Sequence, residues 1–202
     1  MAAKSLNDLY LQKLQLLLDA EEQGLQAMPQ LAQRVQSPEL RKALETHRRQ
    51  TEEHVRRLQQ LAQRRAQGPE NTPSNGCVSM RALIEEAQTI LPMIKDADTS
   101  DAFIIGAQQA VEHHEIASYG TARTWARQLG YDEDADLLQR TLDEEGETDE
   151  LLTQIAERSV NREASRGADR EAGIASRGQR ERSTGGGGSG SGASAERGAD
   201  MR

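Results

Sequence analysis

The sequence predicts an all-α protein whose main domain, residues 1–163, is an antiparallel four-helix bundle. Aromatic residues make up only 2% of the chain, whereas Leu, Ala, Glu, Gln and Arg, which favour helices, are abundant. Apolar residues recur in alternating steps of three and four along four long segments, the spacing of one helix face. Residues 164–202 are rich in Gly, Ser and Arg and poor in large apolar side chains, so we expect a disordered tail there.

Two long helices are expected at the start of the chain. The first covers residues 6–36, and the second begins at Ser37–Pro38 and lasts to residue 65. Ser is a good N-cap, Pro is tolerated at the first helical position, and the acidic Glu39 suits the first turn. Because the connecting turn is so short, the two helices should be antiparallel neighbours.

A long crossover separates this hairpin from a second one. Residues 67–76, QGPENTPSNG, have the composition of a loop, and residues 80–94 have the pattern of a short extra helix. The third long helix should begin at Ser100 and end at Gly130, and the fourth should cover residues 132–162. A long connection of this kind allows the second hairpin to pack against the first.

Charge, hydropathy and cysteine content narrow the class of protein. The formal net charge is −8, so the bundle should be a poor general binder of nucleic acid, and we expect no specific nucleic-acid partner. No run approaches the ~18 to 20 apolar residues of a membrane helix, and Met1 to Leu6 lack a signal-peptide core, so we expect a soluble cytoplasmic protein.

Cys77, the only cysteine, lies in the expected loop. We expect a thiol without a role there or, as the alternative, a disulfide between subunits.

Polar residues interrupt the apolar stripe of every long helix near its middle. In an antiparallel bundle of helices of similar length the midpoints lie at one height, so these interruptions should form a single layer. One lies on the first helix, three lie on the second, and two lie on each of the third and fourth helices. The interrupting residues are Glu21; His47, Thr51 and His54; Glu112 and Glu115; and Glu145 and Asp149.

Such a layer needs compensating positive charge. Buried carboxylates repel one another, and each costs several kcal/mol to desolvate. Two metal ions would neutralise them, with carboxylates bridging and capping the ions and histidine nitrogens completing each one. We therefore predict a centre of two metal ions, with iron as the first choice and manganese or zinc as alternatives. The residues alone favour as ligands Glu21, Glu112 and Glu145, then Glu115 one turn from Glu112, together with either His54 or His47.

The roles of several residues beside these ligands are open. His47 and His54 both lie on the stripe a heptad apart, and we expect only one of them to face the metals. Tyr119 and Thr51 are expected to support the ligands by hydrogen bonds, with a core tyrosine as the alternative for Tyr119. His113 and His114 flank the stripe of the third helix and are expected to have a solvated or interface role, and Glu144 is expected on the solvated face of the fourth helix.

The chain resembles the YciE/YciF-type bacterial stress proteins of the ferritin-like superfamily over roughly residues 5–160. The similarity extends through all four long helices in order. The matching residues are AEEQ (20–23) with Met28–Pro29; His47 with Thr51 and Arg57–Leu58; VEHHEIA (111–117) with YGT (119–121); RQLG (127–130); and DEE (143–145) with Thr148–Asp149.

This resemblance implies a ferritin-like bundle that forms a homodimer, acts in stress responses and holds a di-iron or related centre. One position departs from the family pattern. Where the family usually has Glu before Thr51, this chain has Gln50, whose neutral amide is a weaker ligand for hard ions. Either Gln50 binds one metal poorly or His54 fills the gap. Carried over by residue, the resemblance favours as ligands Glu21, Glu112, Glu115, Glu145 and Asp149.

Two functions are consistent with these observations. The first is a carboxylate/histidine di-metal centre that reacts with O2 or peroxide, oxidising iron or consuming the peroxide. The second is a non-catalytic, stress-induced dimer with a binding or structural role, whose metal site is degenerate or redox-inactive and whose tail recruits a partner. The sequence alone leaves open which is correct, and therefore whether the protein is an enzyme.

Overall fold

The fold is described here from a computed structural model, in which residues 3–65 and 76–167 are described. Over these residues the chain is helical and contains no strand. Two short segments of other helical type follow the third and fifth α-helices. The elements are α1 (Leu6–Arg34), α2 (Pro38–Arg65), α3 (Val78–Ile90), the 3-10 helix Leu91–Met93, α4 (Ala97–Gln128), α5 (Asp132–Ile155) and the π-helix Ala156–Val160.

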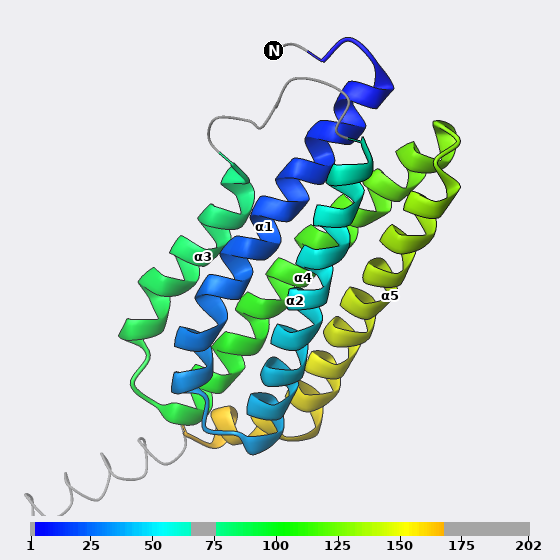
Figure 1. Ribbon diagram of the computed structural model, residues 1–202. Helices are drawn as coiled ribbons and strands as arrows, with labels where there is room; N and C mark the ends of the chain where they lie inside the picture. The colour runs from blue at the N-terminus through cyan, green and yellow to red at the C-terminus, as the bar shows by residue number, and fades with distance from the viewer. Residues whose placement is uncertain (1–2, 66–75, 168–202) are drawn as a thin grey trace, which may run out of the picture. The chain divides into compact units, whose positions relative to one another are not determined.

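The four long helices form the predicted bundle, and α3 is the predicted extra helix of the crossover. Helix α1 packs against α2 and α4, and α5 packs against α4 and α2. Each of these four pairs is antiparallel, and α3 lies on the outside of the bundle against α1 and α4 (Figure 1). Because α3 returns the chain to the end of the bundle where α2 begins, α4 runs parallel to α2. The all-α fold predicted from the sequence is therefore confirmed.

Helix α4 begins three residues earlier than the sequence predicts. Its N-cap is Asp96, whose carboxylate accepts a hydrogen bond from the backbone N–H of Thr99 at 2.8 Å. Asp and Ser are N-caps of similar strength, and Asp96 satisfies one of the free N–H groups in the first turn of the longer helix. The other end agrees with the prediction, because Gly130 has a positive φ of 73° just beyond the helix.

Asp101 fixes the turn between α1 and α2 against the start of α4. Its carboxylate is buried and accepts hydrogen bonds from the backbone N–H groups of Gln36, at 2.9 Å, and Ser37, at 2.6 Å. These two N–H groups lie between helices and have no helical partner. A charged acceptor on a third helix therefore determines how the first hairpin packs against α4.

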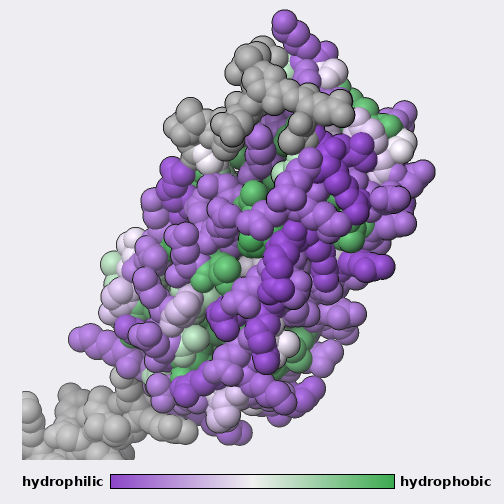
Figure 2. All heavy atoms as spheres, in the orientation of Figure 1, coloured by the Kyte–Doolittle hydropathy of each residue, from purple (hydrophilic) through white to green (hydrophobic). Residues whose placement is uncertain are grey.

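Two apolar clusters occupy the two ends of the bundle. The cluster near the α1–α2 turn includes Val35, Leu44 and Ile104, and the cluster at the opposite end includes Leu14 and Leu58. The inward-facing residues between them are mainly polar, and a third, small apolar cluster of Ala20, Cys77 and Met80 joins α1 to α3. This is the pattern predicted from the stripes, which are apolar at both ends and polar in the middle. The outer surface in Figure 2 is mostly hydrophilic, with small hydrophobic areas among polar side chains.

The C-terminal end of the described chain continues as a helix. The π-helix Ala156–Val160 follows α5, with Ala156 and Val160 buried, and helical residues extend to residue 167. Most of the predicted tail, residues 168–202, and the loop residues 67–75 lie outside the described residues. Among the helices that are described, none combines the length and the apolar character needed to cross a membrane.

Candidate metal centre

The candidate centre lies between the two apolar clusters, where all four long helices place polar side chains. Glu21 comes from α1, two histidines from α2, two glutamates from α4 and one glutamate from α5. All six side chains are buried, with at most 2% exposure. Each takes this place because its position on the stripe points it toward the bundle axis. These residues are Glu21, His47, His54, Glu112, Glu115 and Glu145.

One group of possible ligands consists of Glu21, His54 and Glu145. The Nδ1 atom of His54 lies 3.4 Å from Oε1 of Glu21 and 3.0 Å from Oε1 of Glu145. One donor atom from each of the three residues falls within 4.8 Å of the others. Three helices, α1, α2 and α5, therefore converge on one small volume.

A second group consists of His47, Glu112 and Glu145, with the same 4.8 Å limit between donor atoms. The Nε2 atom of His47 lies 3.1 Å from Oε1 of Glu112, and its Nδ1 atom lies 4.0 Å from Oε2 of Glu145. Glu145 belongs to both groups and offers one carboxylate oxygen to each. This is the arrangement that a bridging carboxylate between two ions requires.

The expectation that only one of the two histidines faces the layer is wrong. His47 and His54 are two helical turns apart, or about 10.5 Å along α2. The layer is tall enough to accept both because Glu145 stands between them and divides it into two groups. Each histidine approaches a different group.

Hydrogen bonds determine which nitrogen of His47 is free. The hydroxyl of Thr148 lies 3.2 Å from Nδ1 of His47, and it donates its single proton to the backbone carbonyl of Glu144 at 3.0 Å. The hydroxyl can therefore only accept from His47, so Nδ1 carries a proton. Burial lowers the pKa of His47 despite the raising effect of Glu112, which favours the neutral ring. Its Nε2 lone pair then faces Glu112.

His54 is oriented in a similar way by Glu144. The Nε2 atom of His54 lies 2.8 Å from Oε2 of Glu144, and that carboxylate also accepts hydrogen bonds from Arg57 at 2.6 and 3.0 Å. Burial would raise the pKa of Glu144, but the bonds from Arg57 and His54 outweigh burial and lower it. An ionised Glu144 accepts the Nε2 proton, so Nδ1 of His54 points into the layer.

Glu144 was expected on the solvated face, and this expectation is wrong. Its side chain is 28% exposed, so one side meets solvent while its carboxylate contacts His54 and Arg57. The partner of Glu144 is two helices away in sequence. Position on the α5 helix alone does not indicate that contact.

Burial and mutual repulsion act strongly on the carboxylates. Burial raises the pKa of Glu115 well above its usual value, and the nearby Glu21, Glu145 and Glu112 raise it further. The pKa of Glu145 is also raised well above its usual value, first by burial and then by the nearby carboxylates of Glu21 and Glu112. Without a cation, the layer therefore holds protons that free carboxylates would lose.

Tyr119 supports Glu21 as predicted in outline from the sequence. Its buried hydroxyl donates a hydrogen bond to Oε1 of Glu21. Burial raises the pKa of Tyr119 well above its usual value, and the Glu21 and Glu145 carboxylates add to this shift. The phenol therefore stays protonated and remains a donor. Thr51, the other predicted supporting residue, instead donates to the backbone carbonyl of His47 at 3.1 Å, within its own helix.

The buried atoms of this layer fit metal ions because they have no other partner. Among the described residues, few buried side-chain oxygens and nitrogens lack a hydrogen bond, and most of those converge here. Buried polar groups in proteins are nearly always satisfied, and carboxylate oxygens with imidazole nitrogens suit iron, manganese and zinc. The unpartnered atoms of the layer are Nε2 of His47, Nδ1 of His54, Oε2 of Glu112, and Oε1 and Oε2 of Glu145.

Two residues predicted as ligands lie at the edge of the layer. Asp149 is 22% exposed; its carboxylate accepts a hydrogen bond from Gln109 at 3.0 Å and pairs with His113 at 3.3 Å. His113 itself is 69% exposed, as expected. Gln50 is partly buried on α2, one position before the buried Thr51. Asp149 therefore has partners of its own on the outer side of α4 and α5.

Sequence reasoning missed three residues that contact the candidate ligands. Glu144 and Thr148 contact the two histidines, and Gln108 donates to Oε1 of Glu112 at 2.8 Å. Gln108 could have been found, because it lies one helical turn before Glu112 on the same buried stripe. Thr148 lies one turn after Glu144 and gives no such signal, since Thr occurs on many helix faces.

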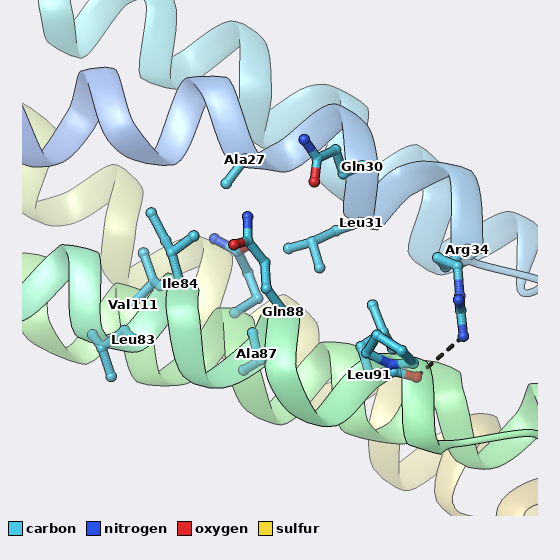
Figure 3. Close-up of a pocket in the computed structure, with 13 residues that line it drawn as sticks. Ala27, Gln30, Leu31, Arg34, Leu83, Ile84, Ala87, Gln88, Leu91 and Val111 are labelled. Carbon is cyan, nitrogen blue, oxygen red and sulfur yellow. Dashed lines mark hydrogen bonds between the residues drawn. The ribbon is translucent and has the colours of Figure 1, made fainter.

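A cavity of about 510 Å³ lies between α1, α3 and α4 on the side of the bundle that α3 covers. Its walls are mainly apolar, including Leu31, Ile84 and Val111, and Arg34 closes one end by donating to the carbonyl of Leu91 at 3.1 Å (Figure 3). Gln108 also lines the cavity. One side chain therefore contacts both the cavity and Glu112.

Comparisons with known proteins place the chain in a family. Residues 5–165 match the family described as Domain of unknown function (DUF892). The chain is 37% identical over 164 residues to Protein YciF of Escherichia coli (strain K12), which covers 81% of this chain and 98% of that protein.

Solved structures agree with this assignment. The crystal structure of the E. coli stress protein YciF matches with a TM-score of 0.73 and 36% identity, covering 79% of this chain and 99% of that chain. YcfI from Rhodopseudomonas palustris matches with a TM-score of 0.71 and 33% identity, covering 76% of this chain and 96% of that one. A protein from Xanthomonas campestris, at 23% identity and a TM-score of 0.63, shares the fold. The chain therefore belongs to the DUF892 family and is a relative of the YciF-type bacterial stress proteins, as its sequence predicted.

Proposed function

We propose that this protein holds two iron ions in the polar layer and oxidises Fe2+ with O2 or peroxide as part of a stress response. The observation that carries this proposal is the pair of ligand groups that share Glu145. Bound iron would supply the electron transfer to the oxidant. Manganese is the alternative redox metal, since it accepts the same oxygen and nitrogen donors.

The residues of the chain have separate roles in this proposal. Glu21 and His54 would hold one ion, His47 and Glu112 would hold the other, and Glu145 would be shared by both groups. Glu115 is buried beside these carboxylates and adds a further negative charge to balance the ions. Glu144 and Thr148 keep the histidine lone pairs directed inward, and this orientation raises metal affinity.

The surroundings support a reaction with a small oxidant. The apolar clusters above and below the layer limit the access of water. The cavity of about 510 Å³ offers a small, weakly polar molecule a path that ends at Gln108. We propose that Gln108 separates the cavity from Glu112 and that its replacement by Ala opens the layer to solvent.

Metal analysis and oxidation kinetics test the proposal. Protein purified without chelator should contain iron or manganese, and metal-free protein should bind Fe2+ anaerobically at a ratio of two per chain. Addition of air should then produce an absorbance change that is faster than the oxidation of free Fe2+. Glu145→Gln should abolish this acceleration, while Glu147→Gln, an exposed position two residues away, should leave it unchanged.

Two results would contradict the proposal. One is the absence of tight Fe2+ or Mn2+ binding at neutral pH. The other is binding of two ions without any faster oxidation than in the Glu145→Gln variant. The second result would favour the alternative function, a non-catalytic binding or structural protein with a redox-inactive ion such as Zn2+. The R. palustris relative is described as a candidate structural protein, which supports that alternative.

We further propose that the protein acts as a homodimer in the cytoplasm. The resemblance to the YciF-type proteins supports both statements. Sedimentation velocity of the full chain at micromolar concentration tests the first, with a mass twice that of one chain as the expected result. A monomer under these conditions would contradict it.

A further inference from the structure

A second group of reactive side chains surrounds Cys77, apart from the metal layer. The sequence suggested a loop thiol without a role, but the structure places Cys77 as the N-cap residue of α3 and only 5% exposed. Its backbone N–H donates to Oδ2 of Asp19 at 2.6 Å. Gly76 precedes it with φ of 59°, and a Cβ there would lie 2.5 Å from the same carboxylate oxygen. This close packing fixes the position of the cysteine.

The sulfur of Cys77 is surrounded by hydrogen-bonding groups. It lies 3.3 Å from Oγ of Ser79 and 3.5 Å from Nε2 of His114, and these two groups are 3.2 Å apart. His114 comes from α4, so the contact joins the crossover helix to the bundle. The backbone N–H of Met80 also interacts with the sulfur. Donors from three residues can therefore point at a thiolate.

These contacts favour the ionised form of the thiol. Burial alone would raise the pKa of Cys77, but the hydrogen bonds from His114 and Ser79 outweigh burial and lower the pKa from 9.0 to about 7. The N-terminus of the 13-residue helix α3 adds its dipole in the same direction. Among the described residues, the charged and titratable side chains around Cys77 are His114 from α4, which contacts the sulfur, Asp19 from α1, which accepts from the backbone N–H of Cys77, and Lys13 from α1, which lines the same pocket.

A pocket of about 270 Å³ opens beside the sulfur and is polar on one side. Lys13, Cys77, Ser79 and His114 line it. Ser118 also lines it and is largely buried, at 8% exposure, and no hydrogen bond to its hydroxyl is found among the described residues. A hydroxyl in this position is available to a ligand or a water in the pocket. The pocket is large enough for a small polar molecule next to the thiol.

We propose that Cys77 is a peroxide-reactive cysteine and that the pocket beside it binds hydrogen peroxide or a small hydroperoxide. The thiolate attacks one peroxide oxygen, the S–O bond forms, and the O–O bond breaks. Cys77 becomes sulfenic acid, and the leaving oxygen takes a proton from solvent and departs as water or an alcohol. The sulfur is oxidised by two electrons, and the peroxide is reduced by two. Ser118 and Lys13 are placed to hydrogen-bond the peroxide oxygens.

The oxidised cysteine requires a thiol from outside the chain. Cys77 is the only cysteine in the sequence, so no internal disulfide can form. A low-molecular-weight thiol would react with the sulfenic acid to give a mixed disulfide and water. Cys77 is then a site of reversible modification on the crossover helix.

Mass spectrometry of the full chain tests this proposal. Hydrogen peroxide at low molar excess should add one oxygen atom to wild-type protein, and dimedone should trap the product on Cys77. His114→Leu removes the side-chain donor and should slow this reaction by on the order of tenfold at pH 7, because one pKa unit changes the thiolate fraction about tenfold. His113→Leu, which changes the exposed neighbour on the same helix, is the matched control and should react like wild type.

Further measurements keep the test independent of the metal centre and of folding. The Glu145→Gln variant should retain the wild-type rate, because the reaction needs no metal. The rate of wild-type alkylation by iodoacetamide should rise with pH around a midpoint of about 7. Equal rates in wild type and His114→Leu, oxidation on methionine instead of Cys77, or an alkylation midpoint near the ordinary value of ~8.5 would each overturn the proposal.

Discussion

His47 directs the lone pair of Nε2 at the carboxylate of Glu112 across 3.1 Å. Nδ1 of the same ring donates to Thr148, so no proton remains on the neutral ring to join Nε2 to the carboxylate. A lone pair facing a carboxylate oxygen at this distance is repulsive. A cation between the two atoms removes the repulsion, and this relationship is the strongest indication of a metal ion in the molecule.

Replacement of Thr148 by Val should weaken one of the two metal sites. Nδ1 of His47 would lose its acceptor, and loss of such a supporting partner typically costs 10- to 100-fold in metal affinity, or about 1 to 3 kcal/mol. Isothermal titration with Fe2+ or Zn2+ under anaerobic conditions should show one tight site and one weakened site. Two unchanged sites would show that Thr148 does not orient His47.

Replacement of Glu144 by Gln should weaken the other site by a similar factor. The amide accepts the His54 proton less strongly than an ionised carboxylate, and its pairing with Arg57 is lost. The double variant with Thr148→Val should then bind neither ion tightly. If both single variants weaken the same site, the assignment of one histidine to each ion is wrong.

Replacement of Glu145 by Gln should stabilise the metal-free protein and prevent metal from stabilising it further. Glu145 is repelled by Glu21 and Glu112, and burial disfavours its charge, so a neutral amide should raise the melting temperature by about 2 to 4 °C for each 1 kcal/mol gained. Wild type should instead gain about 2.7 kcal/mol from metal at 100 times its dissociation constant. Differential scanning calorimetry with and without metal measures both effects. A less stable metal-free variant would contradict the repulsion.

The stability of the metal-free protein should fall as the pH rises above about 4.5. Glu115 has a folded-state pKa well above its ordinary value of 4.5, so between these two values the folded protein binds more protons than the unfolded chain. The contribution of Glu115 to stability is therefore fully present at a pH below its ordinary pKa. It is lost as the pH rises through its raised folded-state pKa, by up to about 1.4 kcal/mol per pH unit for each proton.

Urea unfolding at several pH values measures this dependence. Glu115→Gln removes one of the titrating groups, so its metal-free form should show a shallower decline than wild type. Because both proteins contain all other titrating groups, their comparison cancels the contributions of those groups to the pH dependence. Glu144, whose pKa is shifted downward, is one of them. With metal present the decline should reverse, because ligands bind ions in their deprotonated form. Identical slopes in both metal-free proteins would exclude the proposed protonation of Glu115.

Replacement of Asp149 by Asn should leave metal affinity unchanged within about twofold. The Asp149 carboxylate contacts Gln109 and the exposed His113, and exposed ion pairs contribute only about 0 to 1 kcal/mol. Titration of the variant with Fe2+ beside Glu21→Gln measures this. A tenfold loss in Asp149→Asn would return Asp149 to the ligand set that the sequence predicted.

The fold and the position of the polar layer along the bundle axis could be predicted from the sequence. Helical periodicity places Glu21, Glu112 and Glu145 on the inward stripes, and helices of similar length bring these positions together. The structure confirms the helical bundle and the polar layer between two apolar ends. Periodicity resolves only the face of a helix, however, and Asp149 lies beside the inward face closely enough to be counted with it.

The contacts between helices were beyond the reach of the sequence. Thr148 and His47 are far apart in the chain, and their hydrogen bond depends on the rotation of α5 against α2. The same holds for Glu144 with His54 and for Cys77 with His114. Each of these pairs joins two elements, so no pattern within one element indicates it. The early start of α4 at Ala97 is different, because its N-cap, Asp96, belongs to the same segment of the chain.

Anomalous X-ray diffraction from crystals of natively purified protein tests the two-metal centre most directly. Data collected on either side of the iron and manganese absorption edges should show two peaks within the bundle. One should lie among Glu21, His54 and Glu145, and the other among His47, Glu112 and Glu145. If crystals soaked in either metal showed anomalous peaks only at the protein surface, with these side chains hydrogen-bonded to water instead, no metal centre would exist.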